Sequence, residues 1–407
     1  MAVAQDLAPK PAHVPADLVV DFCRFTAPEL KRAPHRRIAA LYAGLPPVFW
    51  TPRNGGHWIA ARSSVAMQML KRYDLFSSDP RHCPAMVRSP RTNPNQYDPP
   101  EHTAMRAVVG DRFDLAAIPA LEDGIRARAR ALIDAAVPRG GAEFLAEIAQ
   151  RFPVEIFLDM AGAPLGDRDR LLRMVERFTR EPAVEDRLRA LRDLADFLQH
   201  YLDERAACPG TDLLSAVAHG RAGGRPLTAD ERQGMAALLF LGGLDTVAAM
   251  LSFIMAHLAL HQDDYRRLVA DPDRLPRAVH ELIRYFGVAS MERAATGDFA
   301  FEGVAFRAGD RIVFTTQTYG LDNPRMDDPL RVDLDRRMAP HAVFGAGAHR
   351  CLGAHLAQAE IRIFLEEWIR RFAGFALAGG EEPETVSGIV WSPVAVPLIW
   401  SPSDLRG

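Results

Sequence analysis

The strongest constraint on the fold is an apolar run over residues 235–260. The run is long enough to raise the question of a membrane span. It contains Asp245, His257 and the pair Gly242-Gly243, however, and ionisable side chains are costly inside a bilayer. We therefore expect a helix that is buried in protein rather than in lipid.

The start of this helix is marked by a capping box. Thr228 and Glu231 have the spacing at which a hydroxyl and a carboxylate each satisfy a free backbone N–H group. If the helix continues to about Gln262, it spans roughly 50 Å at 1.5 Å per residue. A helix this long and apolar has to cross the middle of the fold.

Elsewhere the apolar residues recur mostly at three and four positions, so the fold class is mainly α with minor β. The predicted helices are residues 121–136, 142–161, 168–178, 186–205, 275–286 and 356–372. Short strands are predicted over residues 298–306, 311–316 and 386–400. No linker or repeat divides the 407 residues, which favours one domain over residues 1–407.

Composition and charge exclude several classes of protein. The formal net charge of −3 argues against a general nucleic-acid-binding surface. The four cysteines, Cys23, Cys83, Cys208 and Cys351, are too scattered for a disulfide framework or a zinc site. Residues 1–17 lack a continuous apolar core, so we expect a flexible segment there, no signal peptide or membrane anchor, and a soluble cytoplasmic protein.

Cys351 lies in the glycine-rich segment FGAGAHRCLG, residues 344–353, which leads directly into a predicted helix. Glycines let the backbone pass close to the sulfur, and the positive end of a helix favours a thiolate. A lone cysteine is usually an ordinary half-buried residue. The pattern F-x-x-G-x-H-x-C-x-G followed by L-A-x-x-E fixes so many positions that it indicates the axial thiolate ligand of a haem iron.

This pattern resembles the haem-binding signature of the cytochrome P-450 superfamily. The resemblance implies haem b as cofactor, Cys351 as the iron ligand, and a long central helix over the haem with small β-sheets. It also assigns Phe344 and Gly353 to the cofactor-binding loop, and His102, Arg106, Arg293 and His349 to the two haem propionates, although a surface charge is the commoner role for any one of them.

Two further motifs acquire roles from the same resemblance. Asp245-Thr246 in GGLDTV is similar to the family's acid–alcohol pair, which delivers protons during O2 activation. Taken alone, these residues are equally explained as a structural Asp and a Thr bonded to its own helix. Glu281 and Arg284 match the E-x-x-R motif, with Arg336 as its partner, and we expect this trio to be structural.

Among soluble bacterial members, the chain resembles the camphor hydroxylase group most, through NGGHW, FSS, DPPE, GGLDTV and SGIV. That likeness implies a separate [2Fe-2S] ferredoxin and its NADH-dependent flavin reductase as partners, with Arg106 and Arg112 as candidate docking charges. Pro90 stands where that group has a substrate-binding Tyr, and Met291 where it has an Asp, while Tyr97 lies at another register. Camphor is therefore disfavoured, and a small apolar, terpenoid-like substrate is expected.

The expected function is that of a haem-thiolate monooxygenase that hydroxylates this substrate with O2 and two electrons from the ferredoxin. Epoxidation, demethylation, dehydration or peroxide-driven oxidation on the same fold are alternatives, and a non-catalytic haem gas sensor is another. By matching positions, six residues line the substrate pocket, although each is equally suited to a core: Leu238, Gly242, Thr246, Ala289, Ile389 and Val390.

Overall fold

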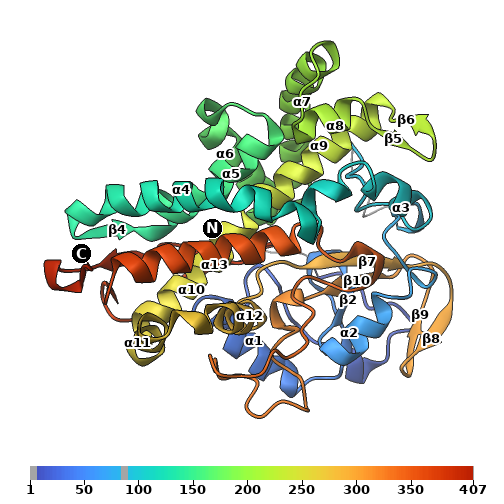
Figure 1. The fold of residues 1–407 in the computed structure, drawn as a ribbon. Helices are drawn as coiled ribbons and strands as arrows, with labels where there is room; N and C mark the ends of the chain where they lie inside the picture. Colours follow the sequence, from blue (N-terminus) through green and yellow to red (C-terminus); the bar gives the residue numbers. More distant parts are fainter. Residues whose placement is uncertain (1–6, 84–89, 407) are drawn as a thin grey trace.

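The computed structural model describes residues 7–83 and 90–406. Helices make up most of the molecule, and the strands β2 (His57–Ala60), β7 (Met291–Ala295) and β10 (Arg311–Phe314) lie together below the right-hand end of α13 (Ala354–Arg371) in the view of Figure 1. The mainly α, minor β fold class is therefore confirmed. The longer helices are α4 (Pro119–Ala136), α5 (Phe152–Ala161), α6 (Arg168–Arg180), α7 (Val184–Ala207), α9 (Ala229–Leu244), α10 (Thr246–Leu260), α12 (Leu275–Tyr285) and α13 (Ala354–Arg371).

The apolar run forms α9 and α10, which cross the molecule one after the other with Asp245 between them (Figure 1). The predicted capping box is present, since Thr228 accepts from the Glu231 amide and Glu231 accepts from the Thr228 amide. Within the described residues, Ala229–Leu260 is the single segment long and apolar enough to cross a membrane, and 67% of its most apolar window is buried inside the fold. It is thus a core element of the molecule.

Several helices pack around α9 and α10. α13 packs against α4 and α12, and α10 contacts α5, α9 and α13. The amphipathic patterns of α4, α6, α7, α12 and α13 produce helices close to the predicted ranges. Their buried faces join one hydrophobic cluster that extends from Phe22 to Trp400.

The predicted helix over residues 142–161 is interrupted, and this part of the prediction is wrong. Gly141–Glu143 forms strand β4, and Leu145–Ala149 forms one turn of π-helix before α5 begins at Phe152. β4 pairs with β14 (Pro397–Ile399), far away in the sequence. The Glu143 carboxylate also accepts from the backbone amide of Val396. A partner some 250 residues away therefore overrides the local helical pattern.

The main sheet has five strands in the order β1-β2-β10-β7-β3. These strands are Val48–Thr51, His57–Ala60, Arg311–Phe314, Met291–Ala295 and Phe76–Ser77. The predicted hairpin over residues 298–306 is present as β8 (Phe299–Phe301) and β9 (Val304–Phe306). Near the C-terminus, the predicted strands appear as β12 (Thr385–Val386), β13 (Ser392–Pro393) and β14.

The N-terminal segment expected to be flexible is described only from residue 7 onward, and residues 1–6 lie outside the described part. Val14 is buried, and His13 Nε2 lies 2.9 Å from Asp310 Oδ2 at the end of the main sheet. Val19 forms a β-bridge with Trp50. Residues 7–17 therefore lie against the body of the protein.

Candidate active site

The central helix is interrupted at Asp245, where φ is −118° and ψ is −33°. The two glycines before it differ in their surroundings. A Cβ atom at Gly242 would meet nothing within 4 Å, whereas one at Gly243 would overlap the ring of Phe157. Thr246 Oγ1 donates to the Gly242 carbonyl at 3.0 Å, as a threonine bonded to its own helix does. The helix is thus packed tightly at Gly243 and open at Gly242 and Thr246.

This difference predicts opposite effects for two neighbouring substitutions. Gly243→Ala should lower the free energy of unfolding by about 1–3 kcal/mol, because the new methyl group overpacks against Phe157. Gly242→Ala has free space and a helical backbone, so it should be neutral or stabilising by up to about 1 kcal/mol. Denaturant unfolding of both variants checks this, and equal destabilisation would contradict the packing of Gly243.

The Asp245 carboxylate is buried and has two partners on the end of α6. Its Oδ1 accepts from Arg180 Nη2 at 2.6 Å, and its Oδ2 accepts from Thr179 Oγ1 at 3.1 Å. Arg180 Nη1 donates in turn to Glu176 Oε1 at 2.7 Å. Burial raises the pKa of Asp245, and the positive charge of Arg180 acts against that rise. The guanidinium of Arg180 therefore links the buried Asp245 carboxyl group to the half-buried carboxylate of Glu176.

Thr179 and Arg180 were missed by the sequence reasoning. The helical pattern was followed only to Phe178, although the helix continues to Arg180. Nothing in the local pattern distinguishes Arg180 from the many other arginines of the amphipathic helices. The one available signal is that a buried Asp245 requires a cationic partner.

The Cys351 loop is shaped by backbone bonds and two left-handed glycines. The Cys351 amide donates to the Phe344 carbonyl at 2.8 Å, and α13 begins three residues later, just after Gly353. Gly345 and Gly347 both have φ of 71°. A Cβ at Gly347 would lie 2.6 Å from the Leu70 carbonyl oxygen. Glycine is required there by both backbone conformation and space.

Cys351 is an exposed residue, but enough of the protein lies around its sulfur for burial to act on the thiol. Burial is the largest influence and raises the pKa of Cys351. A backbone hydrogen bond from Gly353 and the charges of Arg106 and Arg350 act in the opposite direction. Gly353, Arg106 and Arg350 therefore favour the thiolate, but in the protein alone their effect on the pKa of Cys351 is smaller than that of burial.

Four basic side chains from three parts of the chain gather beside this loop. His102 and Arg106 belong to α3 (Glu101–Arg106), Arg293 lies on β7, and His349 belongs to the loop itself. The rings of His102 and His349 have centroids 4.1 Å apart. Arg106 and Arg293 both act on the pKa of His102 and of His349 by their charge. The structure thus brings together the four residues that the motifs singled out.

This group has more buried cationic capacity than acid to balance it. Arg293 is 3% exposed, and its Nη1 donates to the Glu292 carbonyl at 2.7 Å. Within the described residues, neither Arg293 nor Arg106 forms an ion pair, and His102 Nδ1 is buried without a partner. Burial lowers the pKa of Arg293 to about 10 and that of His102 to about 4. Asp98 acts on Arg293 by its charge but forms no ion pair with it among the described residues, so the Arg293 guanidinium is suited to binding an anion.

The predicted charge network of the E-x-x-R motif is confirmed. Arg284 Nε and Nη2 each donate to one oxygen of Glu281 at 2.7 Å, and Arg336 Nε donates to Glu281 Oε1 at 3.1 Å. Arg284 is fully buried and also donates to the carbonyls of Pro329 and Arg331. The network ties α12 to the segment before the cysteine loop, which is a structural role.

The predicted pocket positions come together from three chain segments. Ala289 forms a β-bridge with Val390, and the Ser290 amide donates to the Ile389 carbonyl at 2.9 Å. The Ile389 amide donates to the carbonyl of Thr179, whose hydroxyl binds Asp245. Leu238, Thr246, Ala289 and Ile389 are half-buried and Gly242 is exposed, whereas Val390 is buried. As a pocket lining these residues remain a prediction.

Of the two departures from the camphor hydroxylase pattern, Met291 lies beside Arg293 of the site. Met291 is on β7, with its Sδ 3.8 Å from Arg293 Nη2, so a thioether stands beside a guanidinium. Tyr97 lies under the guanidinium of Arg91, 3.7 Å from ring centroid to Cζ. Pro90 begins the described segment that docks on α9, where the Asn93 amide group donates to the Glu231 carbonyl at 2.8 Å.

Comparison with known proteins places the chain in a family. A family model described as Cytochrome P450 matches residues 174–396. The chain is a cytochrome P450. Its relatives include a protein named probable cytochrome P450 127A1 from Sinorhizobium fredii, 33% identical over 403 residues and 97% of each chain. A steroid C26-monooxygenase from Mycolicibacterium smegmatis is 30% identical over 315 residues, covering 75% of this chain and 79% of the relative.

Solved structures agree with this assignment. The structure of cytochrome P450 CYP101C1 has a TM-score of 0.84 at 37% identity, and that of CYP101J2 has a TM-score of 0.85 at 32% identity. Both comparisons cover 97% of this chain and 100% of the other. The expected P450 fold and superfamily membership are therefore confirmed, and the enzyme is a monooxygenase whose cofactor is haem b.

The residues of this P450 fit that cofactor. Haem carries two carboxylates. In the group formed by His102, Arg106, Arg293 and His349, Arg293 is a buried cation, Arg106 is a half-buried cation, and His102 Nδ1 is a buried ring nitrogen without a partner. Cys351 is exposed and lies close enough to Arg106 of that group for their charges to interact, so its side chain is accessible to an iron held there. Both observations concern residues that would otherwise be left unpaired.

Proposed function

We propose that this cytochrome P450 hydroxylates a small apolar, terpenoid-like substrate in the cytoplasm, using O2 and two electrons from a [2Fe-2S] ferredoxin and its NADH-dependent flavin reductase. The observation that carries the proposal is the pairing of an open, apolar helix face at Gly242 with a buried acid at Asp245. An apolar face suits an apolar substrate, and the acid supplies protons to a site away from bulk water.

When bound, haem would supply the iron at which O2 is activated, and the thiolate of Cys351 would hold that iron. The chain's own residues would hold the cofactor and orient the substrate. His102, Arg106, Arg293 and His349 hold the propionates by charge and hydrogen bonds. The small side chains at positions 242, 289 and 389 would leave room for a substrate, exclude water and orient one C–H bond.

Proton delivery is assigned to Asp245 and Thr246. The Asp245 carboxyl group would turn from Arg180 toward the open side of the helix at Gly242, because rotation about its side chain changes the direction of its oxygens. Burial raises the pKa of this carboxyl, which makes the protonated form easier to reach. Thr246 Oγ1 donates its own hydrogen to the Gly242 carbonyl, so on the open side of the helix it would act as a hydrogen-bond acceptor that orients the group receiving the proton.

A separate ferredoxin would dock near the cysteine loop, where basic residues reach the surface. Arg350 is exposed, and Arg112 is partly exposed beside Asp111. Arg106, also expected to contribute, is half-buried and acts on Cys351 and His102 by its charge. We therefore assign docking to Arg112 and Arg350 and reserve Arg106 for the cofactor.

An optical titration of the ferric holoenzyme tests the substrate class. Monoterpenes, norisoprenoids and small aromatics are added in turn, and a fitting molecule should displace water from the iron and shift the Soret band toward the high-spin position. Binding should be followed by substrate-dependent NADH consumption with a ferredoxin system. No shift with the small terpenoids, together with a shift and product from larger lipids, would overturn the proposed substrate class.

A further inference from the structure

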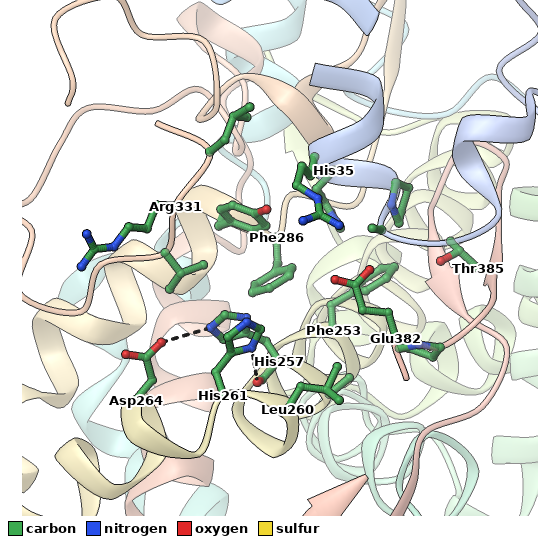
Figure 2. A pocket seen from close by; sticks show the side chains of 18 residues that line it. His35, Phe253, His257, Leu260, His261, Asp264, Phe286, Arg331, Glu382 and Thr385 are labelled. Atoms are coloured by element: carbon green, nitrogen blue, oxygen red, sulfur yellow. Dashed lines mark hydrogen bonds and ion pairs between the residues drawn. The ribbon is translucent and has the colours of Figure 1, made fainter. Parts of the chain in front are cut away.

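A second cavity of about 400 Å³ lies away from the cysteine loop. It is partly open and is bounded by the first turn of α1 (Pro34–Ala43), the C-terminal half of α10, the end of α12 and residues 382–385 (Figure 2). Its lining on α10 begins at Phe253, seven residues after Thr246 and therefore roughly 10 Å along the helix. A volume of this size is typical of small-molecule sites.

One part of the wall of this cavity is a cluster of rings that includes Phe253 and Phe286. The ring of His35 lies 4.8 Å from Phe253 and 5.3 Å from Phe286, measured between centroids, and the ring of His257 lies 5.4 Å from Phe286. Figure 2 shows the two phenylalanines between His35 and His257, with Leu260 on the same side as His257. Such walls suit a flat or alicyclic apolar molecule.

His35 gives the cavity one defined polar group. It is 2% exposed, and its Nε2 lies 2.7 Å from the Gly287 carbonyl oxygen. A carbonyl only accepts, so Nε2 carries the hydrogen and Nδ1 of the neutral ring is an acceptor. Burial lowers the pKa of His35 to about 4, which keeps the ring neutral at pH 7. No group of the described residues donates to Nδ1, and the ring lines the cavity.

The charges around the rim cancel. Arg36 and Arg331 stand against Asp264 and Glu382, and Asp264 is itself 3.5 Å from His257 Nε2 (Figure 2). Two cations and two anions give no net attraction for a charged ligand. Besides His35 Nδ1, the lining holds two buried polar atoms without a hydrogen-bond partner among the described residues, His257 Nε2 and Thr385 Oγ1. A neutral hydroxyl group, which both donates and accepts, suits such a set.

We propose that this cavity is a second small-molecule site, which binds a neutral, mainly apolar alcohol or phenol through a hydroxyl group that donates to His35 Nδ1. The site is separate from the pocket above the haem and is not required for the proposed hydroxylation. If no ligand bound at this second site, the proposed hydroxylation at the haem would be unaffected. Phenol is a suitable probe, and toluene is its match in shape without the hydroxyl.

The test is a calorimetric titration of the holoenzyme with phenol while 4-phenylimidazole, bound to the iron, blocks the pocket above the haem. Phenol should bind with a stoichiometry of one, roughly three- to tenfold more tightly than toluene, because one neutral hydrogen bond separates the two molecules. Absence of phenol binding, or equal affinity for toluene, would overturn the proposal.

Two variants locate the binding. His35→Gln keeps an N–H donor for the Gly287 carbonyl but moves the acceptor, so it should abolish the preference for phenol over toluene. Leu260→Trp fills the cavity from its half-buried rim without touching His35, and it should weaken both ligands at least tenfold. Each variant should retain the carbon monoxide spectrum of the wild type, which reports an intact haem site. Unchanged phenol affinity in Leu260→Trp would place the binding elsewhere and overturn the proposal.

Discussion

Replacing Cys351 with serine should abolish hydroxylation and change the optical spectrum of the carbon monoxide complex. A serine hydroxyl is not ionised near pH 7 and donates far less electron density to iron than a thiolate does. The substitution is small, and the backbone bond from residue 351 to the Phe344 carbonyl does not depend on the side chain. Product formation should fall below detection, and the carbon monoxide difference spectrum should lose its thiolate signature.

Cys208→Ser is the matched control, because Cys208 is exposed at the end of α7, distant in sequence from the cysteine loop. It should leave both the spectrum and turnover unchanged. Thermal unfolding of the two variants separates loss of the ligand from loss of the fold. A serine variant at position 351 with a wild-type carbon monoxide spectrum would rule out this cysteine as the ligand.

The helical framework was predictable because periodicity and capping act locally. The Thr228–Glu231 box and the amphipathic repeats of α4, α6, α7, α12 and α13 depend on residues three and four positions apart. The break within residues 142–161 was not predictable in this way. β4 exists because Ala142 and its neighbours pair with Leu398 and the rest of β14, and the local sequence carries no sign of that partner.

In the candidate site too, residues within motifs could be recognised from the sequence, whereas partners distant in the chain could not. Its residues within motifs were found, since Cys351, Thr246 and the Glu281–Arg284 pair lie at characteristic spacings. The partner of Asp245 was not found, because Arg180 reaches it across 65 residues of chain. The dominance of burial over the thiolate-favouring groups around Cys351 is likewise a property of the packed molecule, so a local helix-terminus argument did not reveal it.

Replacing Asp245 with asparagine should lower the maximal rate of product formation by at least about a hundredfold, the contribution typical of a positioned general acid. Asparagine matches aspartate in shape and still offers an oxygen to Arg180, but it neither binds nor releases a proton. Because the Asp245 side chain is 2% exposed and bonded to α6, the affinity for substrate should change less than twofold. Spin-state titration and product formation by the same holoenzyme measure the two quantities separately.

Glu176→Gln provides the control for electrostatic side effects, since it alters the other partner of Arg180 and leaves the carboxyl at position 245 in place. It should reduce the rate by much less than Asp245→Asn. A solvent deuterium isotope effect on turnover should increase in Asp245→Asn alone, because proton delivery then limits the rate. If substrate affinity and rate fell in equal proportion, or if Glu176→Gln matched Asp245→Asn, Asp245 would be a structural anchor for α6, and the proton pathway would have to run through other groups.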